Sequence, residues 1–362
     1  MRIKIGFLSC LLVANAYAAE TIVGPWVVEP AKQTATIGWI TETSQVKVGT
    51  APDQLTQSIP VLHYQKISLT GLKPGQTVYY DAFGSDEGAG HFKTPPPSGT
   101  PFHFVVFGDT RTRDALHARI VAAIVKDNPD FVVHTGDLVQ NGYDTAQWPN
   151  FFEIEHELLR QTVFFPVLGN HERDNPQFNE FFDLKNPYYS FDWGSAHFAL
   201  IDGDVANTGP DPEARERFWN EQKQWLEDDL EHSQTAQFRF VVMHEPPFTV
   251  NHKHPNHVST WTPTLVPMFE KYHVTAVFAG HDHNYQHHLK DGIHYVVTGG
   301  GGAPLAPAEE PLPAITLKVE SVEHFVRIRV SGERAAVEAV ALDGHLIDRF
   351  ELTGAASESG SK

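Results

Sequence analysis

The 362-residue sequence contains five apolar runs that each end in side chains able to bind a metal ion. In chain order the runs end in GDTR, GDLV, GNHE, VMHEPP and GHDH, which supply Asp109, Asp137, Asn170, His171, His244, His281 and His283. Open α/β sheets place their binding sites at the carboxyl ends of strands. A single aspartate there is commonly a turn former or a helix cap, and a single histidine is commonly structural. Five such endings in succession instead predict one shared site.

The types of these side chains indicate which metal ions the site would bind. Carboxylate, amide oxygen and imidazole together suit Fe, Zn or Mn better than Ca or Mg alone. Six strong ligand candidates exceed the need of one tetrahedral catalytic ion with an open position. A pair of ions that share a bridging carboxylate would use all of them and could clamp both oxygens of an in-line displacement at phosphorus. Glycine precedes four of the endings, which fits turns where the backbone approaches a bound group closely.

The elements that must position these residues alternate between strand and helix. Apolar runs such as FHFVVFGD and DFVVHTGD predict strands. Between them, Leu116, Ile120 and Ile124 recur at the four-residue spacing of a helix. Residues 324–344 predict closing hairpin strands. This alternation is typical of an α/β domain, which we assign to residues 97–354.

The sequence outside this domain divides into an export signal, an all-β region and a tail. Residues 1–18 combine a basic start, an apolar run and small residues, which predicts a cleaved signal peptide and a periplasmic or secreted protein. Residues 20–96 alternate with period two between turns, which predicts a small all-β sandwich of immunoglobulin or fibronectin type III kind. TPPPSGTP at residues 94–101 predicts a stiff linker, and residues 355–362 predict a disordered tail.

The charge balance excludes one class of partner. The chain has 27 basic and 45 acidic residues, a formal net charge of −18 at pH 7. Nucleic-acid binding needs a basic surface, so we expect no nucleic-acid scaffold as a partner. Beyond the export signal, no stretch of the sequence is long and apolar enough to predict a transmembrane segment.

The ordered set GD, GD, GNHE, H and GHDH resembles the calcineurin-like metallophosphoesterases. The all-β region, PFHFVVFGD and GHDHNY are similar to the purple acid phosphatase-like branch of that family. The resemblance covers almost the whole mature chain. It implies an α/β core of the four-layer α+β sandwich type, preceded by the small β-sandwich domain.

The resemblance also implies a role for each residue of the site. The ligands of a first metal ion would be Asp109, Asp137 and His283. The ligands of a second ion, which shares the bridging Asp137, would be Asn170, His244 and His281. His171 would lie outside both sets, where it holds the phosphate and protonates the leaving alkoxide.

Two positions depart from the family pattern. Metallophosphoesterases usually place a histidine two residues after the first aspartate, where this chain has Arg111. Purple acid phosphatases place a tyrosine three residues after the bridging aspartate, where this chain has Gln140, so we expect no tyrosinate colour. Arg111 has two interpretations. Its guanidinium binds a substrate phosphate through two N–H groups, or it pairs with a nearby carboxylate.

Other histidines lie near the expected site in the sequence. His252 and His254 of NHKHPNH are candidate phosphate contacts by the same resemblance, and the alternative is a solvated loop. His134 is expected to pack as a buried neighbour of the site, whereas His287 and His288 are expected in an ordinary loop. The glycine run TGGGGAP is expected beside the site, since it lacks the lysine of a nucleotide P-loop.

Together these features predict an exported, acid phosphatase-like enzyme in which a metal-bound hydroxide attacks a phosphate monoester. A phosphodiesterase for nucleotides or lipid head groups would use the same ligands and differ only in the shape of its pocket. A third alternative is a surface-binding protein with a relic hydrolase domain, against which the full set of ligands argues. The expected partner is a small phosphoester, and the expected cofactor is a pair of Fe, Zn or Mn ions.

Overall fold

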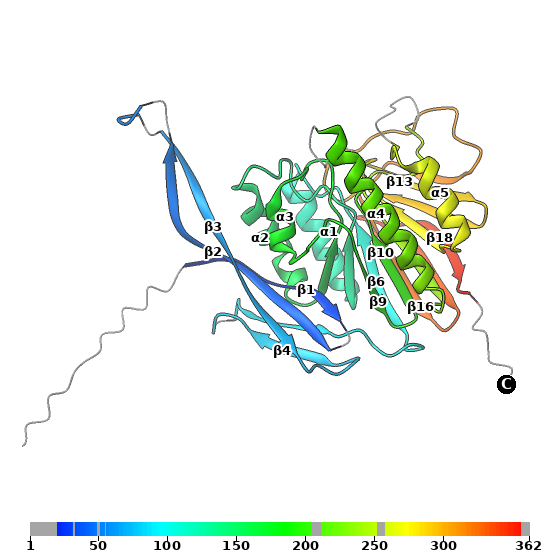
Figure 1. Cartoon of the computed structure of the whole chain (residues 1–362), viewed down its shortest axis with the longest axis horizontal. Helices are drawn as coiled ribbons and strands as arrows, with labels where there is room; N and C mark the ends of the chain where they lie inside the picture. The colour runs from blue at the N-terminus through cyan, green and yellow to red at the C-terminus, as the bar shows by residue number, and fades with distance from the viewer. Residues whose placement is uncertain are drawn as a thin grey trace, which may run out of the picture.

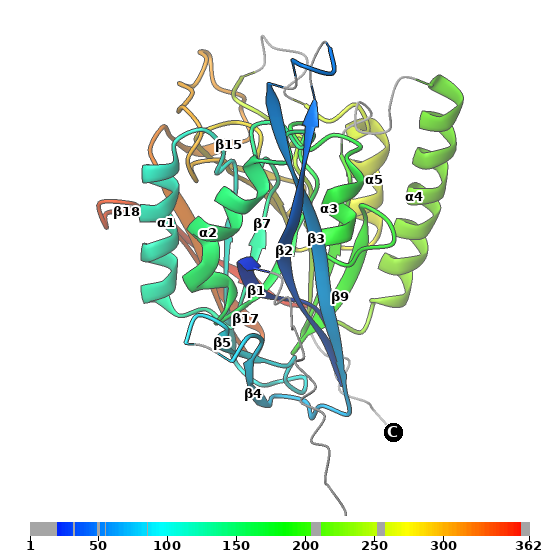
Figure 2. The same cartoon turned by 90° about the vertical axis from the view of Figure 1, so that its left-hand side faces the viewer.

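A computed structural model describes residues 20–355 of the chain, apart from residues 32, 49–50, 55, 85, 204–210 and 252–257. Two large β-sheets lie face to face, and helices cover their outer faces (Figures 1 and 2). This arrangement is the four-layer α/β core that the family resemblance implies. The predicted signal peptide (1–18) lies outside the described residues, and so does the predicted tail except for its first residue.

The first sheet has nine strands and contains the first three strands that lead to the site. In spatial order its strands are β18 (Leu346–Thr353), β17 (Arg334–Ala341), β16 (His324–Ser331), β6 (Phe102–Phe107), β7 (Phe131–His134), β8 (Val163–Pro166), β1 (Glu20–Ala31), β2 (Thr34–Val48) and β3 (Gln57–Thr70). Strands β6, β7 and β8 are parallel, so their carboxyl ends meet at one edge. The predicted hairpin over 324–344 is confirmed as the antiparallel pair β16–β17.

The second sheet has seven strands and supplies the remaining two endings. In spatial order its strands are β15 (Thr316–Glu320), β13 (Tyr285–Lys290), β14 (Ile293–Thr298), β12 (Ala276–Ala279), β11 (Phe238–Val242), β10 (Ala196–Leu200) and β9 (Tyr189–Trp193). Strands β10, β11, β12 and β14 are parallel neighbours. Their carboxyl ends therefore also share one edge of the sheet.

Aromatic side chains fill the space between the two sheets. Phe104 of the first sheet stacks on Phe131 at a ring distance of 5.0 Å and meets Phe198 of the second sheet edge-on at 5.2 Å. Phe198 in turn contacts Phe240 at 5.0 Å. All four rings are fully buried, and burial of each stabilises the fold by roughly 1.5–3 kcal/mol. Strands covered on both faces need apolar residues on both, which explains the continuous apolar runs in the sequence.

Five helices of the described chain cover the outer faces of the sheets. The nine-stranded sheet is covered by α1 (Asp114–Asp127), α2 (Gln147–Leu159) and α3 (Pro176–Phe181), and the seven-stranded sheet by α4 (Pro212–His232) and α5 (Thr262–Lys271). Ile120 and Ile124 of α1 are fully buried against the first sheet, which confirms the predicted helix. Within the part of the chain that the structure describes, no helix combines the length and the apolar character of a membrane span.

The N-terminal region is all-β, as predicted, and it shares its core with the rest of the chain. Strand β1 pairs with β8 at Val27 and Val163, which joins β1, β2 and β3 to the nine-stranded sheet. The ring of Trp26 stacks on Phe152 of α2 at 4.0 Å, and its Nε1 donates to the Phe181 carbonyl at 2.9 Å. Strands β4 (Thr77–Asp81) and β5 (Ala89–Lys93) form a separate two-stranded ribbon below the long β2–β3 hairpin in Figure 1. The domain boundary after residue 96 stays a prediction.

Candidate metal centre

The carboxyl ends of five strands, β6, β7 and β8 of one sheet and β11 and β12 of the other, converge at one edge of the molecule. The structure brings together eight of the residues selected from the sequence: Asp109, Arg111, Asp137, Asn170, His171, His244, His281 and His283. The other two, His252 and His254, lie outside the described residues. Roles for the eight as ligands and catalytic groups stay predictions, whereas their proximity is a fact of the fold.

The backbone at the strand ends adopts conformations that ordinary residues rarely use. Asp109, Asp137 and His281 have φ angles of 57°, 57° and 68°, in the left-handed region that non-glycine residues seldom occupy. Such strain persists where the surrounding structure imposes it, and it is common at functional sites. A Cβ atom on Gly136 would lie 2.6 Å from the Nδ1 atom of His244, and one on Gly280 would lie 2.5 Å from an Asp109 oxygen. Neighbouring side chains therefore approach the backbone closely at these two glycines, as predicted.

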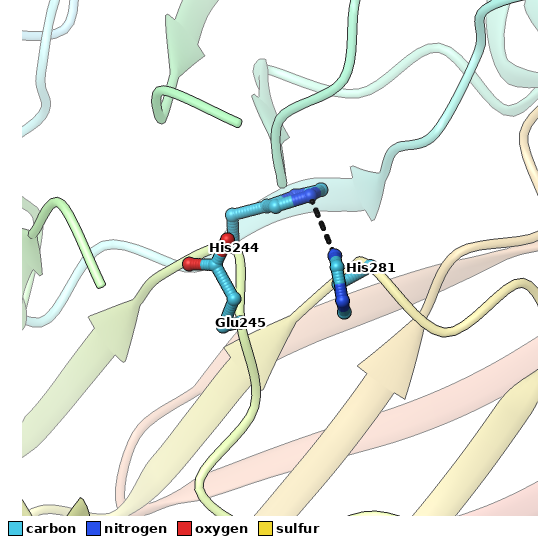
Figure 3. A group of neighbouring side chains, drawn as sticks. All are labelled: His244, Glu245 and His281. Atoms are coloured by element: carbon cyan, nitrogen blue, oxygen red, sulfur yellow. Dashed lines mark hydrogen bonds between the residues drawn. The ribbon is translucent and has the colours of Figure 1, made fainter. Parts of the chain in front are cut away.

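Asn170, His244 and His281, here called the histidine group, point their donor atoms at one another. The Oδ1 atom of Asn170 lies 3.0 Å from Nε2 of His244 and 3.1 Å from Nδ1 of His281. These two nitrogens are 3.3 Å apart, and the rings meet edge-on, as Figure 3 shows. Oδ1 of Asp137 lies 3.3 Å from the same His244 nitrogen. Ligands about 2.0–2.1 Å from one tetrahedral ion stand roughly 3.3 Å apart, so this spacing suits a metal ion.

Backbone carbonyls fix the orientation of two site histidines. The Nδ1–H of His244 donates to the Thr135 carbonyl at 2.7 Å, which leaves Nε2 free to face the centre. The Nδ1–H of His283 donates in the same way to the Pro304 carbonyl at 2.7 Å. A second partner of this kind selects the tautomer and holds the ring of a metal-binding histidine.

Asp109, Asp137 and His283, here called the carboxylate group, form a second set of donors next to the first. One donor atom from each lies within 4.8 Å of the others, and His283 Nε2 is 3.5 Å from Asp109 Oδ1. Both carboxylates are buried. The two sets therefore lie side by side, which is the arrangement typical of a binuclear centre.

Burial and neighbouring charges perturb the titration of the carboxylate group. Burial raises the pKa of Asp109, and the nearby Asp137 raises it further. Burial would raise the pKa of Asp137 as well, but His244, His171 and Arg111 outweigh it and hold the pKa at about 2. Burial and the charge of Arg111 lower the pKa of His283 to about 4. The imidazole of His283 is therefore neutral at pH 7, which is the form that binds metal ions.

Arg111 contacts two of the three members of the carboxylate group. Its Nε donates to Asp137 Oδ2 at 3.0 Å, and its Nη2 lies 3.3 Å from His283 Nε2. Its Nη1 donates to Oε1 of Gln140 at 2.8 Å. Of the two interpretations of Arg111, the pairing with a nearby carboxylate is therefore present in the structure.

The two groups differ in how well they fit a metal ion. The histidine group offers imidazole nitrogens and an amide oxygen, and the Asp137 carboxylate adjoins it. These are ligands of the kind that borderline metals take. In the carboxylate group, a permanently charged guanidinium already lies against two of the donors. The histidine group fits an ion as it stands, whereas the carboxylate group has a cation of its own.

Two glutamates at the site were missed in the sequence analysis. Glu172 is fully buried and accepts backbone N–H bonds from Asp137 at 2.9 Å, Val139 at 3.0 Å and Gly169 at 3.0 Å. Burial and the charge of Asp137 raise its pKa to about 8. Glu245 offers an oxygen within 4.8 Å of donor atoms of its neighbour His244 and of His281 (Figure 3). The signal was present, since each glutamate directly follows a selected histidine in GNHE and VMHEPP.

His171 lies at the open side of the centre. Its backbone N–H donates to Asp137 Oδ1 at 3.1 Å, and its Nδ1 lies 2.6 Å from the Gln140 carbonyl. Its Nε2 is 3.8 Å from Asp137 Oδ2, and 22% of its side chain is exposed. This position is outside both groups of donors and in reach of a molecule that approaches from solvent.

The structure corrects one prediction about the remaining histidines and supports two others. His287 and His288 lie on strand β13 and are buried, so their assignment to an ordinary loop was wrong. Strands β14 and β15 flank them, and His287 lies 2.8 Å from an Asp348 oxygen. His134 is fully buried, as predicted, with its Nε2 3.1 Å from the Thr110 hydroxyl. The glycine run adjoins the site as expected, because Ala303 N–H donates to the Asp109 carbonyl at 2.7 Å.

Comparison with known proteins gives a family match over the strands that carry the site. The model of the calcineurin-like phosphoesterases matches residues 102–285. Purple acid phosphatase 15 of Arabidopsis thaliana is 24% identical over 302 residues, which are 67% of this chain and 54% of that protein. A nucleotide pyrophosphatase/phosphodiesterase of Hordeum vulgare is 25% identical over 279 residues, 62% of this chain and 72% of that protein. This chain thus spans about half the length of the first of these relatives.

A solved structure shares the fold over most of the chain. The purple acid phosphatase PPD1 from yellow lupin seeds superposes with a TM-score of 0.70, at 18% sequence identity. The superposition covers 91% of this chain and 74% of the lupin protein. The common fold includes the N-terminal strands as well as the two facing sheets.

Proposed function

This chain belongs to the calcineurin-like phosphoesterase family, and we propose that it is a metal-dependent hydrolase of phosphate monoesters. The observation that carries the proposal is the convergence of imidazole, amide and carboxylate donors from five strand ends on one edge of the molecule. Turns and helix caps do not require such a set of donors to meet at one place. Its relation to the purple acid phosphatases gives the proposal its reaction class.

The residues of the histidine group would hold a metal ion, Fe, Zn or Mn. An ion bound there supplies Lewis-acid polarisation of a phosphoryl oxygen and lowers the pKa of a coordinated water. His244 is held in the correct tautomer by the Thr135 carbonyl, so its Nε2 needs no rearrangement before binding. Asp137 contacts this nitrogen through Oδ1 and contacts Arg111 through Oδ2. Asp137 therefore lies at the middle of the centre.

Groups on the open side of the centre support a monoester as the substrate. A monoester carries up to two negative charges on its phosphoryl group at neutral pH, so it needs cationic or donor groups around it. Arg111 and the partly exposed His171 both contact Asp137 from this side. His171 is placed to donate a proton to the leaving oxygen, because its imidazole is outside the donor groups and reaches solvent.

The main alternative is a phosphodiesterase at the same centre. The barley relative, described as a nucleotide pyrophosphatase/phosphodiesterase, supports it. Hydrolysis of p-nitrophenyl phosphate and of its bis-ester by the metal-loaded protein separates the two. We expect the monoester to have the higher kcat/KM, and the reverse preference would favour the diesterase. If the loaded protein hydrolysed neither ester, the relic interpretation would replace both.

We also propose that the protein is exported, from the sequence pattern of residues 1–18 alone. The mass of the protein purified from its native source tests this. A mature chain that begins at Ala19 supports export, and a chain that retains residues 1–18 contradicts it. Elemental analysis of the same sample identifies the metal.

A further inference from the structure

We propose that Arg111 stands in for a metal ion at the carboxylate group, so that the protein binds one metal ion, at the histidine group. The inference rests on the proposed function, because it concerns how the same centre would hold a phosphoester. It changes the expectation of two ions that follows from the sequence pattern.

The first support is the position of the guanidinium. Its Nε and Nη2 lie 3.0 Å from Asp137 Oδ2 and 3.3 Å from His283 Nε2, so one planar group bridges two donors. These are the donors that an ion in the carboxylate group would have to bind at the same time. The side chain is only 13% exposed, and Nη1 is held by Gln140 at 2.8 Å. The guanidinium is therefore fixed in the centre and is not a surface group that happens to be near.

The second support is charge. Two buried carboxylates side by side need a compensating cation, and a guanidinium supplies one at every accessible pH. A divalent ion in the carboxylate group would lie against this guanidinium, whose Nε and Nη2 already contact Asp137 and His283. Repulsion in a buried site therefore disfavours the second ion.

The third support is the contrast with the histidine group. His244 and Asn170 contact neutral groups, namely the Thr135 carbonyl, each other and His281, besides the shared Asp137. These contacts leave lone pairs for an ion and bring no positive charge. Arg111 and Gln140 are the two positions that depart from the family pattern, and their side chains are hydrogen-bonded to each other. The two departures therefore act as one change, which affects one group only.

Counting bound ions tests the proposal without reference to activity. Wild-type protein, Arg111→His and the control Arg119→His are equilibrated with excess Mn²⁺ and freed of unbound ion, and their metal content is measured. Histidine at position 111 removes the fixed charge and adds an imidazole donor. Arg119 is exposed on α1, so its replacement adds a histidine away from the centre. We expect one ion per chain in wild type and in Arg119→His, and two in Arg111→His.

Electron paramagnetic resonance of the Mn²⁺-loaded proteins gives a second readout. An isolated ion gives a six-line signal, whereas two adjacent ions give an exchange-coupled spectrum. We expect the six-line signal in wild type and coupling in Arg111→His. If Arg111→His does not fold, as judged by circular dichroism, the wild-type count and spectrum still decide.

The outcomes separate this inference from the proposed function. Two ions in wild type, or one ion in a folded Arg111→His, would overturn the role of Arg111. If phosphoester hydrolysis persisted in either case, the proposed function would stand. Absence of any bound ion from wild type, together with absence of hydrolysis, would overturn both.

Discussion

The histidine group and the carboxylate group lie next to each other and meet at one residue, Asp137. One oxygen of that carboxylate faces His244 at 3.3 Å, and the other faces Arg111 at 3.0 Å. On the first side the neighbours are imidazole nitrogens and an amide oxygen. On the second side the chain provides the cation itself. If Arg111 takes the place of a metal ion as proposed, one side chain on a neighbouring loop makes two adjacent groups at the strand ends differ in metal binding.

The largest effect is expected from Asp137→Asn, because it removes the contact that both groups share. We expect kcat/KM for p-nitrophenyl phosphate to fall by about 10³-fold, the upper end for loss of one electrostatic contact at a reacting centre. Steady-state kinetics measure this. The matched control is Asp192→Asn, whose carboxylate is exposed on β9. Activity within a factor of a few of wild type in Asp137→Asn would contradict a central role for this residue.

A comparison of His244→Ala with His283→Ala tests the difference between the groups. We expect His244→Ala to weaken metal binding by at least about 100-fold, since even loss of an outer partner of a ligand costs 10–100-fold. The His283→Ala variant should keep the single ion, because His283 belongs to the carboxylate group, where Arg111 takes the place of an ion. Isothermal titration with Zn²⁺ or Mn²⁺ measures both affinities. Equal losses in the two variants would mean that the groups do not differ.

Glu172→Gln should affect both groups together through the backbone. Glu172 accepts three N–H bonds at the ends of β7 and β8, and a glutamine would turn an N–H₂ group toward some of these donors. A buried donor left without its acceptor costs about 1–3 kcal/mol, so we expect the free energy of unfolding to fall by about 2–3 kcal/mol. Urea unfolding at pH 9, above the pKa of about 8 at which Glu172 ionises, measures the loss. Glu180→Gln, at an exposed position of α3, is the control and should be neutral.

The smallest effect concerns a third set of two carboxylates and an imidazole, away from the centre. Burial would lower the pKa of His197, but hydrogen bonds to Asp192 and Asp229 at 2.9 and 2.8 Å raise it to about 9. Protonated His197 therefore stabilises the fold fully below pH 6.5, its ordinary pKa, and this contribution is lost as pH rises through about 9.

We expect the free energy of unfolding to decline by about 2 kcal/mol more in wild type than in His197→Gln between pH 6.5 and 9. Urea unfolding across this pH range gives the difference. Parallel pH profiles for the two proteins would show that His197 is not held protonated. The same donor types thus bind a proton here and a guanidinium at the carboxylate group, and by our proposal an ion from solution at the histidine group.

The sequence was sufficient for the strands and for the types of side chain that gather at their carboxyl ends, and insufficient for contacts between distant segments. Apolar runs such as FHFVVF are buried on both faces, so they predict parallel strands directly. The contact of Arg111 with His283 joins residues 172 positions apart and depends on how the loops after β6 and β12 meet. His287 is buried on a strand because Asp348, 61 positions away, provides its partner. No local pattern carries that information.

The same limit applies to the N-terminal region. Alternation with period two predicts its strands, but not that Trp26 would fill a gap between α2 and α3. Its partner Phe181 is 155 positions away. A tryptophan in an amphipathic strand fits an independent sandwich as well as a shared core, so only the folded chain decides between them.

The pairing of β6 with β16 has a consequence for synthesis of the chain. Val106 of β6, the strand that leads to Asp109, pairs with Val326, so one edge of β6 has no partner until a segment 220 residues downstream has been made. At roughly 5–20 residues per second, ribosomes need about 10–40 s to make that stretch. During this interval an apolar strand has an unpaired edge, the feature that drives aggregation of incomplete chains. Newly made chains should therefore depend on a holding chaperone until residue 331, the end of β16, has emerged.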